Sequence, residues 1–269
     1  MPISWAVWFA LGACVGSFLN VCIWRLPREQ SIVRPRSRCP QCSRLIAWYD
    51  NVPLISYVLL QGRCRHCRRR IHWRYPVVEG VSGLASVAVF HRFGVGLVGA
   101  VYLFFVWALI VVSFIDLEHR IIPAEITVIG LMGGVVASIV APQLHETDQV
   151  FVSLIRSTHG ALVGAGLLYV TGTIGTLVFR KEAMGLGDVD LFAMAGSILG
   201  WKLVIVTFFI APVLAVLPGV VVLIRKKSHE IPYGPFLSLG LVLSLFFGEW
   251  LIQMSGVEEL ISLFWTYYQ

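Results

Sequence analysis

Residues 97–115 read LVGAVYLFFVWALIVVSFI and carry no charged side chain. As a helix this run would be about 28 Å long, close to the ~30 Å hydrocarbon core of a bilayer. The whole chain has the same character: 57% of its residues are hydrophobic and 13% are charged, compared with about 25% charged residues in globular proteins. A soluble domain could not bury so much apolar surface, so the sequence predicts an integral membrane protein.

Other apolar segments repeat this pattern along the chain. Some are long enough to cross a bilayer as helices, whereas two are short or interrupted. The long segments are 4–24, 121–141, 159–179, 203–224 and 234–253, and the shorter ones are 76–91 and 189–201. We therefore expect an all-α polytopic membrane protein with about eight transmembrane helices.

The distribution of basic residues supports this topology with the N-terminus outside. In that arrangement 18 of the 21 Lys and Arg residues fall in cytoplasmic loops, and Arg92, Arg156 and Lys202 fall on the other face. Removing one span would move the later basic clusters outside. The N-terminus has no basic region followed by a small-residue cleavage site, so we expect the first apolar segment to stay in the membrane.

The predicted organisation has four parts. A first transmembrane helix (1–24) leads into a cytoplasmic module (25–75), which is followed by the membrane core (76–253) and a C-terminal tail (254–269). The module is the loop long enough to fold by itself. Its apolar residues are expected to form a small core, namely Leu45, Ile46, Trp48, Val52, Leu54, Ile55 and Tyr57.

The module contains two Cys-x-x-Cys pairs, Cys39–Cys42 and Cys64–Cys67. Two such pairs can place four thiolates around one tetrahedral Zn²⁺, and four thiolates leave no open position, so the predicted site is structural. His66 could replace one cysteine. Neighbouring arginines are expected to favour ionised thiols, namely Arg38, Arg63, Arg65 and Arg68. A redox role and a cluster of unligated core thiols are the alternatives.

The remaining cysteines and the arginines bear on the environment of the chain. Cys14 and Cys22 lie in the first apolar segment and are interpreted as small core residues, which indicates a reducing compartment. The basic loops could bind nucleic acid in a soluble protein. Because this module lies between two membrane spans, contact with an anionic lipid surface is the favoured interpretation, and no nucleic-acid partner is expected.

Two aspartates adjoin the apolar segments. Asp116 ends the run quoted above, and Asp188 begins another in Gly185-Leu186-Gly187-Asp188. Carboxylates are costly in a bilayer, so such residues are candidates for function, although an acid at a span boundary is often only solvated. Both aspartates fall at the cytoplasmic boundary. If they meet, repulsion would make them share a proton, so that one acts as base on water and the other as acid.

Neighbouring residues are expected to have lesser roles. Gly185 and Gly187 would let the backbone bend and approach a substrate strand closely. Several acids are weaker candidates that could face water or pair with a base, namely Glu118, Glu125 and Asp190. Glu79 enters a span and could pair with Arg74 or serve binding.

The ordered motifs resemble those of the bacterial type IV prepilin peptidases, a family of GxGD aspartic peptidases. The resemblance runs from residue 11 to about 240. It is carried by Gly16-Ser17-Phe18-Leu19-Asn20-Val21, Arg25-Leu26-Pro27, the cysteine pairs, Asp50-Asn51-Val52-Pro53-Leu54-Ile55-Ser56-Tyr57, Gly62-Arg63-Cys64, Arg74-Tyr75-Pro76-Val77-Val78-Glu79, Ile115-Asp116, Gly185-x-Gly187-Asp188 and Ile231-Pro232-Tyr233-Gly234-Pro235-Phe236.

The resemblance implies that Asp116 and Asp188 are catalytic. The substrates would be prepilins or pseudopilins of type IV pili and type II secretion, cut after a glycine at the cytoplasmic face of the inner membrane. Members with a long cysteine-bearing loop are usually also N-methyltransferases that use S-adenosylmethionine. Two positions depart from the family pattern, since Ala124 follows Pro123 where an aspartate is common, and Asp190 replaces a lysine.

Two other classes of function fit part of the sequence. An ion-coupled transporter would use intramembrane aspartates as a proton relay, but it favours acids near the bilayer midplane. An assembly protein could use the basic module for docking, but it gives no reason for two aspartates at matched depths.

Overall fold

The computed structural model describes residues 3–181, 184–226 and 232–254. Within this part of the chain the fold is all-α: no β-strand forms, and β-pairing is limited to the isolated bridges Arg38–Leu45 and Arg63–Arg70. The predicted tail beyond Met254 and the first residue of the motif at 231–236 lie outside the described residues.

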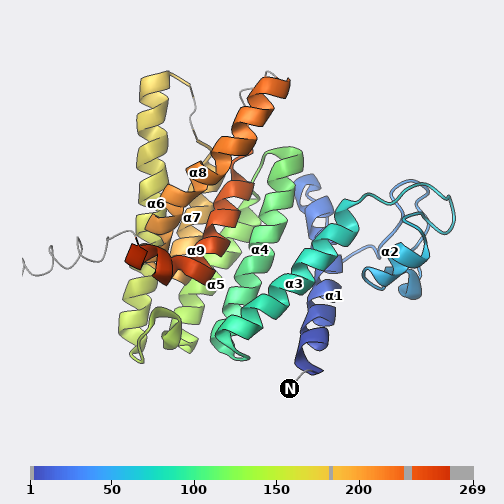
Figure 1. Ribbon diagram of the computed structural model, residues 1–269, viewed down its shortest axis with the longest axis horizontal. Helices are drawn as coiled ribbons and strands as arrows, with labels where there is room; N and C mark the ends of the chain where they lie inside the picture. Colours follow the sequence, from blue (N-terminus) through green and yellow to red (C-terminus); the bar gives the residue numbers. More distant parts are fainter. Residues whose placement is uncertain (1–2, 182–183, 227–231, 255–269) are drawn as a thin grey trace, which may run out of the picture. The chain divides into compact units, whose positions relative to one another are not determined.

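The chain divides into two compact units, Met1–Pro123 and Ala124–Gln269 (Figure 1). The elements of the first are α1 (Ile3–Arg25), η1 (Leu26–Arg28), η2 (Trp48–Asn51), α2 (Ile55–Leu59), α3 (Arg74–Phe93) and α4 (Leu97–His119). Those of the second are α5 (Ala124–Val140), η3 (Pro142–His145), α6 (Val150–Phe179), α7 (Leu186–Leu199), α8 (Trp201–Lys226) and α9 (Gly234–Met254).

Each apolar segment predicted from the sequence coincides with a helix. In the described residues four helical segments are long and apolar enough to cross a membrane, namely Trp5–Arg28, Leu97–His119, Val150–Phe179 and Gly234–Met254. α5 and α7 are shorter, with 17 and 14 residues, whereas α8 has 26. The fold is therefore that of a multi-pass membrane protein.

In the first unit α1 and α3 pack closely because small residues line their contact. A Cβ atom placed on Gly16 would lie 2.8 Å from Cα of Glu79 and 3.0 Å from the carbonyl oxygen of Val78. One turn further along α1, Asn20 donates from Nδ2 to the carbonyl of Tyr75 at 3.1 Å. Small residues that allow close backbone approach, together with such polar links, are typical of helix pairs in membranes.

In the second unit α6 and α7 cross through a pair of glycines. A Cβ on Gly160 would lie 2.1 Å from the carbonyl oxygen of Gly196, and a Cβ on Gly196 would lie 2.0 Å from that of Gly160. Ser157 strengthens the contact by donating its hydroxyl to the carbonyl of Ser197 at 2.8 Å. The backbone of α7, which carries Asp188, is thus held directly against the backbone of α6.

Two sequence predictions differ in detail from the structure. α6, which contains the span predicted at 159–179, begins earlier, at Val150, and Arg156 inside it donates to the carbonyl of His145 at 2.6 Å. Cys14, predicted as a core residue, is exposed, whereas Cys22 is buried. An apolar residue on a membrane helix can face lipid, so apolarity did not predict burial within the protein.

Candidate active site and metal centre

Asp116 lies in the last turn of α4 and its surface is only 6% exposed. The helix ends three residues later, where Arg120 adopts φ 57° and donates its N–H to the carbonyl of Asp116 at 2.9 Å. A left-handed residue at this position is a common way to end a helix. The sequence therefore places a buried carboxylate at a defined helix end.

Asp188 lies in the first turn of α7, which follows the N-cap residue Gly185. Its N–H donates to the carbonyl of Gly185 at 3.2 Å, and a Cβ on Gly185 would lie 3.7 Å from Oδ2 of Asp188. The carboxylate thus folds back over the start of the helix, where the helix dipole favours a negative charge. Because Asp116 and Asp188 belong to different units, their meeting stays a prediction.

The two glycines near Asp188 do not need unusual backbone angles. Gly185 has φ −76°, and Gly187 is not among the described residues with positive φ. Neither glycine is therefore required by a left-handed backbone, and their role in bending and in close approach to a substrate strand stays a prediction. What Gly185 supplies is the absence of a side chain beside the carboxylate of Asp188.

Tyr233 is a residue of the second unit to which sequence reasoning gave no role, although it belongs to the motif quoted at 231–236. It directly precedes α9. Burial, and secondly the negative charge of Asp188, raise the pKa of Tyr233 to about 12. The phenol therefore stays protonated at neutral pH and is a neutral hydroxyl in the electrostatic surroundings of Asp188.

The weaker acidic candidates of the first unit have structural partners. Arg74, which is buried, donates from Nη1 to both carboxylate oxygens of Glu118 at 2.6 Å. Arg74 therefore pairs with Glu118 and ties the start of α3 to the end of α4. Glu79 instead accepts a hydrogen bond from the backbone N–H of Leu54 at 2.8 Å.

The four cysteines lie on two equivalent turns, which we call the knuckles (residues 37–46 and 62–71). In the first, the N–H of Cys39 donates to the carbonyl of Arg44 at 2.9 Å, and Ser43 donates to the carbonyl of Cys39 at 2.9 Å. In the second, Cys64 donates to the carbonyl of Arg69 at 2.9 Å, and Arg68 to that of Cys64 at 3.0 Å. Backbone hydrogen bonds thus shape each knuckle, and a side-chain bond from Nη1 of Arg69 to Oε1 of Gln41 at 2.6 Å joins the two.

The knuckles bring the four predicted ligands together. The Sγ atoms of Cys39, Cys42, Cys64 and Cys67 lie within 4.8 Å of one another, and those of Cys39 and Cys67 are 3.9 Å apart. Tetrahedral coordination at a Zn–S distance of ~2.3 Å requires sulfur atoms ~3.8 Å apart. The quartet therefore fits a metal ion such as Zn²⁺.

The thiols differ in how readily they ionise. Hydrogen bonds from the backbone of Cys67, and to a lesser degree of His66, lower the pKa of Cys64 to about 7, whereas burial raises the pKa of Cys39 to about 11. The backbone and the neighbouring thiols, rather than the arginines named from the sequence, control the ionisation of Cys64.

The predicted apolar core of the module does not form. Leu45, Trp48, Val52 and Ile55 are 50%, 77%, 36% and 59% exposed, and Ile46, Leu54 and Tyr57 are only half-buried. About fifty residues offer too little volume to cover that many apolar side chains. The knuckles, rather than an apolar core, organise the module.

Comparison with known proteins assigns both halves of the chain. Residues 10–93 match a family model described as the bacterial peptidase A24 N-terminal domain, and residues 103–220 match the type IV leader peptidase family. A "Prepilin leader peptidase/N-methyltransferase" of Stutzerimonas stutzeri is 34% identical over 89% of both chains. The chain belongs to the type IV leader peptidase family.

Other members of the family agree. The Myxococcus xanthus "Prepilin leader peptidase/N-methyltransferase" is 41% identical over 80% of this chain, which spans 62% of that relative's length. A "Type 4 prepilin-like proteins leader peptide-processing enzyme" of Escherichia coli is 36% identical over 87% of this chain and 91% of its own. No solved structure matches. None of these relatives is named as a transporter, so the comparison does not support that alternative.

The two matched segments contain the candidate catalytic and metal-binding residues. The segment of the leader peptidase family, 103–220, includes both Asp116 and Asp188, whereas the N-terminal segment contains the four cysteines. Both carboxylates therefore fall in one family segment, although α4 packs with the first unit.

A pH dependence is expected in the module. Arg65 holds Asp50 through Nε at 2.8 Å and Nη2 at 2.6 Å, and this hydrogen bonding lowers the pKa of Asp50. Because the pKa of Asp50 is lower in the folded state than its unfolded-state value of about 3.9, its ionisation stabilises the fold fully at pH values above that unfolded pKa. This stabilisation is lost as the pH falls through the folded-state pKa. Because Arg65 is half exposed, solvent screening keeps the effect small.

Hydrogen exchange of residues 48–60, compared between wild type and Asp50→Asn at each pH, measures this contribution. We expect faster exchange in the variant at neutral pH and a difference that vanishes in acid. A difference that grows as the pH falls would contradict the predicted sign.

Proposed function

We propose that the chain is a membrane aspartic endopeptidase that removes the leader peptides of type IV prepilins and pseudopilins and then N-methylates the new N-terminus. The observation that carries the proposal is membership of the family with 34% identity over 89% of both chains to a relative of that name. Carboxylates at both positions required by the GxGD resemblance support it, namely Asp116 and Asp188.

The proposed chemistry uses the two carboxylates as a pair. The ionised carboxylate takes a proton from a water molecule, whose oxygen attacks the scissile carbonyl, while the protonated carboxyl donates its proton to the carbonyl oxygen. Collapse of this intermediate breaks the C–N bond, and the amine leaves with the proton held by the first carboxyl. The space left beside Asp188 by Gly185 would admit the extended substrate backbone.

The methyl transfer has no assigned residues in this chain. S-adenosylmethionine, the expected methyl donor, would supply an electrophilic methyl group to the new N-terminal amine. Support for this second activity comes from the names of the relatives from Stutzerimonas stutzeri and Myxococcus xanthus.

The proposed setting is the inner membrane with all eight predicted segments as transmembrane helices. The N-terminus would be periplasmic and the cysteine module cytoplasmic. The charge distribution supports this orientation, because 18 of the 21 Lys and Arg residues then lie on the cytoplasmic side. The same orientation puts Asp116 and Asp188 at the cytoplasmic membrane boundary.

The activity is tested by incubating the purified protein in detergent with a prepilin. We expect a shortened product on a gel and, when S-adenosylmethionine is added, an increase in product mass by one methyl group. An intact prepilin would contradict the peptidase, whereas a shortened but unmethylated product would contradict only the methyltransferase.

We further propose that the cysteine quartet holds a structural Zn²⁺. Replacing Cys39 and Cys64 by serine is expected to reduce bound zinc from about one per chain to below about a tenth, because two of the four thiolates are lost. Hydrogen exchange in residues 37–71 should rise, since metal binding and folding are coupled in such sites.

The matched control is Cys14→Ser, which removes an exposed thiol outside the quartet. It should keep zinc at the wild-type level, as measured by atomic emission. Because hydrolysis uses no metal in the proposed mechanism, zinc removal should loosen the module before it stops cleavage. Full zinc content in the double variant would contradict the assignment.

A further inference from the structure

The module exposes an apolar face next to the membrane helices. Ile55, Val58 and Leu59 are 59%, 73% and 76% exposed, and their spacing puts them on one side of α2. Trp48, in the preceding turn η2, is 77% exposed. We call these four residues the α2 face. Side chains of this kind are rarely left in water together, so the α2 face indicates a binding surface.

A hydrogen bond fixes the depth of this face along the membrane helices. The N–H of Leu54, which directly precedes α2, donates to Oε2 of Glu79 at 2.8 Å. Glu79 is five residues beyond Arg74 at the start of α3, a rise of about 7.5 Å along the helix. Accordingly, Figure 1 shows α2 beside the first half of α3 rather than beyond its end.

The turn that brings α2 to this depth has a strained backbone. Leu54 has φ 60° and ψ −49°, and the N–H of Ile55 donates to the carbonyl of Pro53 at 2.6 Å, which closes a tight three-residue turn. Glu79 is buried and its carboxylate binds the N–H of the strained residue. The helix bundle therefore holds the α2 face in place.

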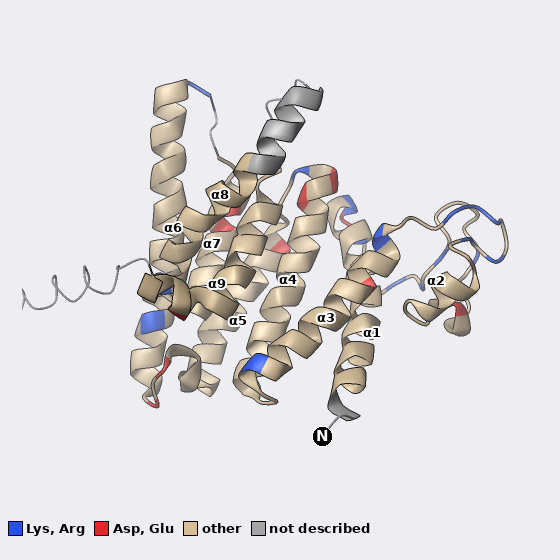
Figure 2. Ribbon diagram, in the orientation of Figure 1, with Lys and Arg blue, Asp and Glu red and all other residues tan. Residues whose placement is uncertain are grey.

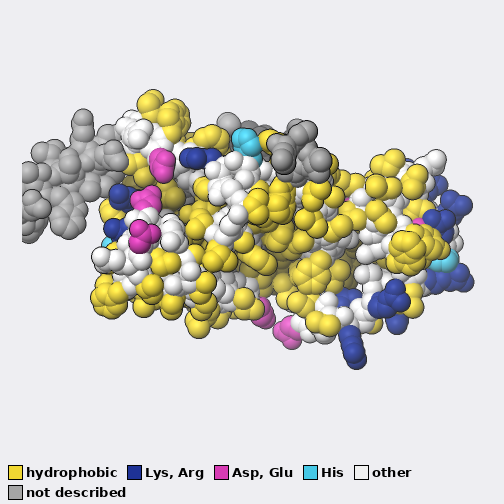
Figure 3. Space-filling model, turned by 90° about the horizontal axis from the view of Figure 1, so that it is seen from below, with side chains coloured by type: hydrophobic (Ala, Val, Ile, Leu, Met, Phe, Trp, Pro, Cys, Tyr) yellow, Lys and Arg dark blue, Asp and Glu magenta, His cyan; other side chains and the backbone are white. Residues whose placement is uncertain are grey.

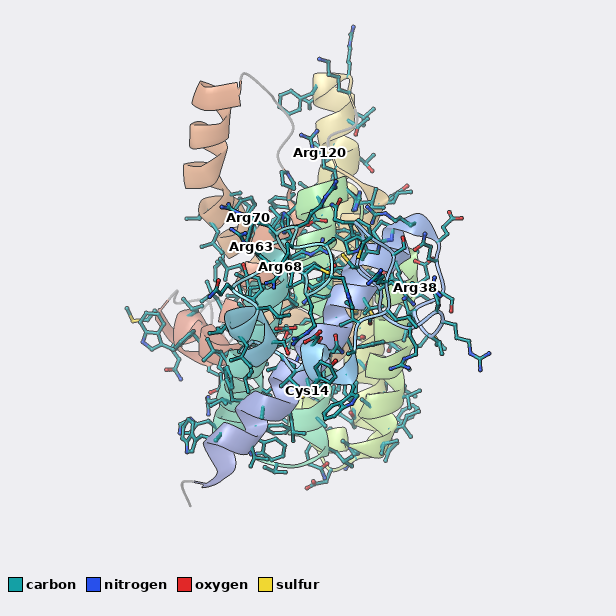
Figure 4. The ribbon with its side chains drawn as sticks, turned by 90° about the vertical axis from the view of Figure 1, so that its right-hand side faces the viewer. Cys14, Arg38, Arg63, Arg68, Arg70 and Arg120 are labelled. Carbon is teal, nitrogen blue, oxygen red and sulfur yellow. The ribbon has the colours of Figure 1, made fainter. Side chains whose placement is uncertain are left out.

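Exposed basic residues accompany the apolar face. They are Arg34, Arg36, Arg38, Arg44, Arg63, Arg65, Arg68, Arg69 and Arg70. Figure 2 shows them on the loops around α2, and Figure 4 places Arg38, Arg63, Arg68 and Arg70 between the level of Cys14, half-way along α1, and that of Arg120. Seen from the side of the N-terminus, hydrophobic side chains cover the module and basic ones form its outer edge (Figure 3).

We propose that the cysteine module is itself embedded in the membrane interface. The α2 face enters the acyl region of the leaflet that surrounds the start of α3, and the arginines bind the phosphates of anionic lipids. Tryptophan at the headgroup boundary and arginine near anionic phosphates are both favourable in this setting. The module thus lies on the bilayer rather than projecting into the cytosol, and this placement does not depend on peptidase activity.

Charge favours lipid over other occupants. A second copy of the module would bring the same excess of arginine and would be repelled, whereas anionic headgroups are attracted. Val77 and Val81 near the start of α3 are also apolar and are 38% and 43% exposed, so the same lipid would cover them and the α2 face.

Photocrosslinking in nanodiscs tests the proposal with the full chain. Benzoylphenylalanine replaces Val58 in one protein and Leu59 in a second, and replaces the exposed knuckle residue Gln41 in the control. In a mixture of phosphatidylcholine and phosphatidylglycerol we expect at least about fivefold more lipid adduct at the two α2 positions than at Gln41. The zinc content of each labelled protein shows whether the module is still folded. If the label at Val58 lowers the zinc content, the label at Leu59 is used to test the proposal.

Several outcomes would overturn the proposal. Lipid adducts as abundant at Gln41, or none at either α2 position in zinc-loaded protein, would exclude insertion of the α2 face. Crosslinks to a second copy or to an added prepilin in place of lipid would assign the face to a protein. Discs of phosphatidylcholine alone should lower the lipid yield, and an unchanged yield would overturn the role of the arginines.

Discussion

Asp116→Asn and Asp188→Asn are each expected to stop prepilin cleavage. An asparagine keeps the size of the side chain but can neither take a proton from water nor give one to the carbonyl oxygen. Loss of one member of a catalytic pair typically costs at least about a thousandfold in rate. The measurement is the initial rate of conversion of a co-reconstituted prepilin, followed by gel mobility.

The control is Asp190→Asn, which changes an exposed acid on the same helix as Asp188. This variant should cleave at a rate close to wild type. All three proteins should be matched in membrane level and zinc content. If either Asp116→Asn or Asp188→Asn cleaves normally under those conditions, the pair is assigned wrongly, and Glu118 and Glu125 become the next acids to test.

Gly160→Ala is expected to destabilise the second unit strongly. The added Cβ would lie 2.1 Å from the carbonyl oxygen of Gly196, which is backbone and cannot turn away, so α6 and α7 must separate. Overpacking of this kind typically costs about 1–3 kcal/mol or more. We expect a lower midpoint of thermal unfolding in detergent and, because α7 carries Asp188, slower cleavage.

A second glycine on α6, Gly166, provides the control for this prediction. Nothing lies within 4 Å of a Cβ placed on Gly166, so Gly166→Ala adds the same methyl group without a clash. Its unfolding midpoint should stay within experimental error of wild type or rise slightly, since alanine favours helix. Equal effects of the two substitutions would show that the contact between Gly160 and Gly196 does not limit stability.

The helices could be predicted from the sequence because a bilayer leaves few other solutions for long apolar runs. The cysteine quartet was equally predictable, since its spacing encodes the geometry of one metal ion. Contacts between distant residues were not. Glu79 binds the backbone of Leu54, and Arg74 pairs with Glu118 rather than with Glu79, and no local pattern indicates either partner.

The exposure of the module's apolar residues was also missed, for a different physical reason. In a soluble protein, Trp48 and Ile55 near a metal site would form a core, and the sequence was interpreted in that way. In a protein surrounded by lipid, an apolar side chain that no other part of the protein covers can contact lipid and so avoid water. Exposure of Cys14 on α1 has the same origin.

The knuckles have a consequence for how this sequence can diverge. Each is closed by backbone N–H and carbonyl groups and by cysteine sulfur, so the side chains between the cysteines are not needed to shape the turn. Two of these side chains instead join the knuckles to each other: Gln41 accepts from Nη1 of Arg69 at 2.6 Å, and Nδ1 of His66 lies 3.3 Å from Nη1 of Arg44. Divergence at Gln41 or His66 would therefore change the link between the knuckles while leaving the turns that carry the cysteines in place.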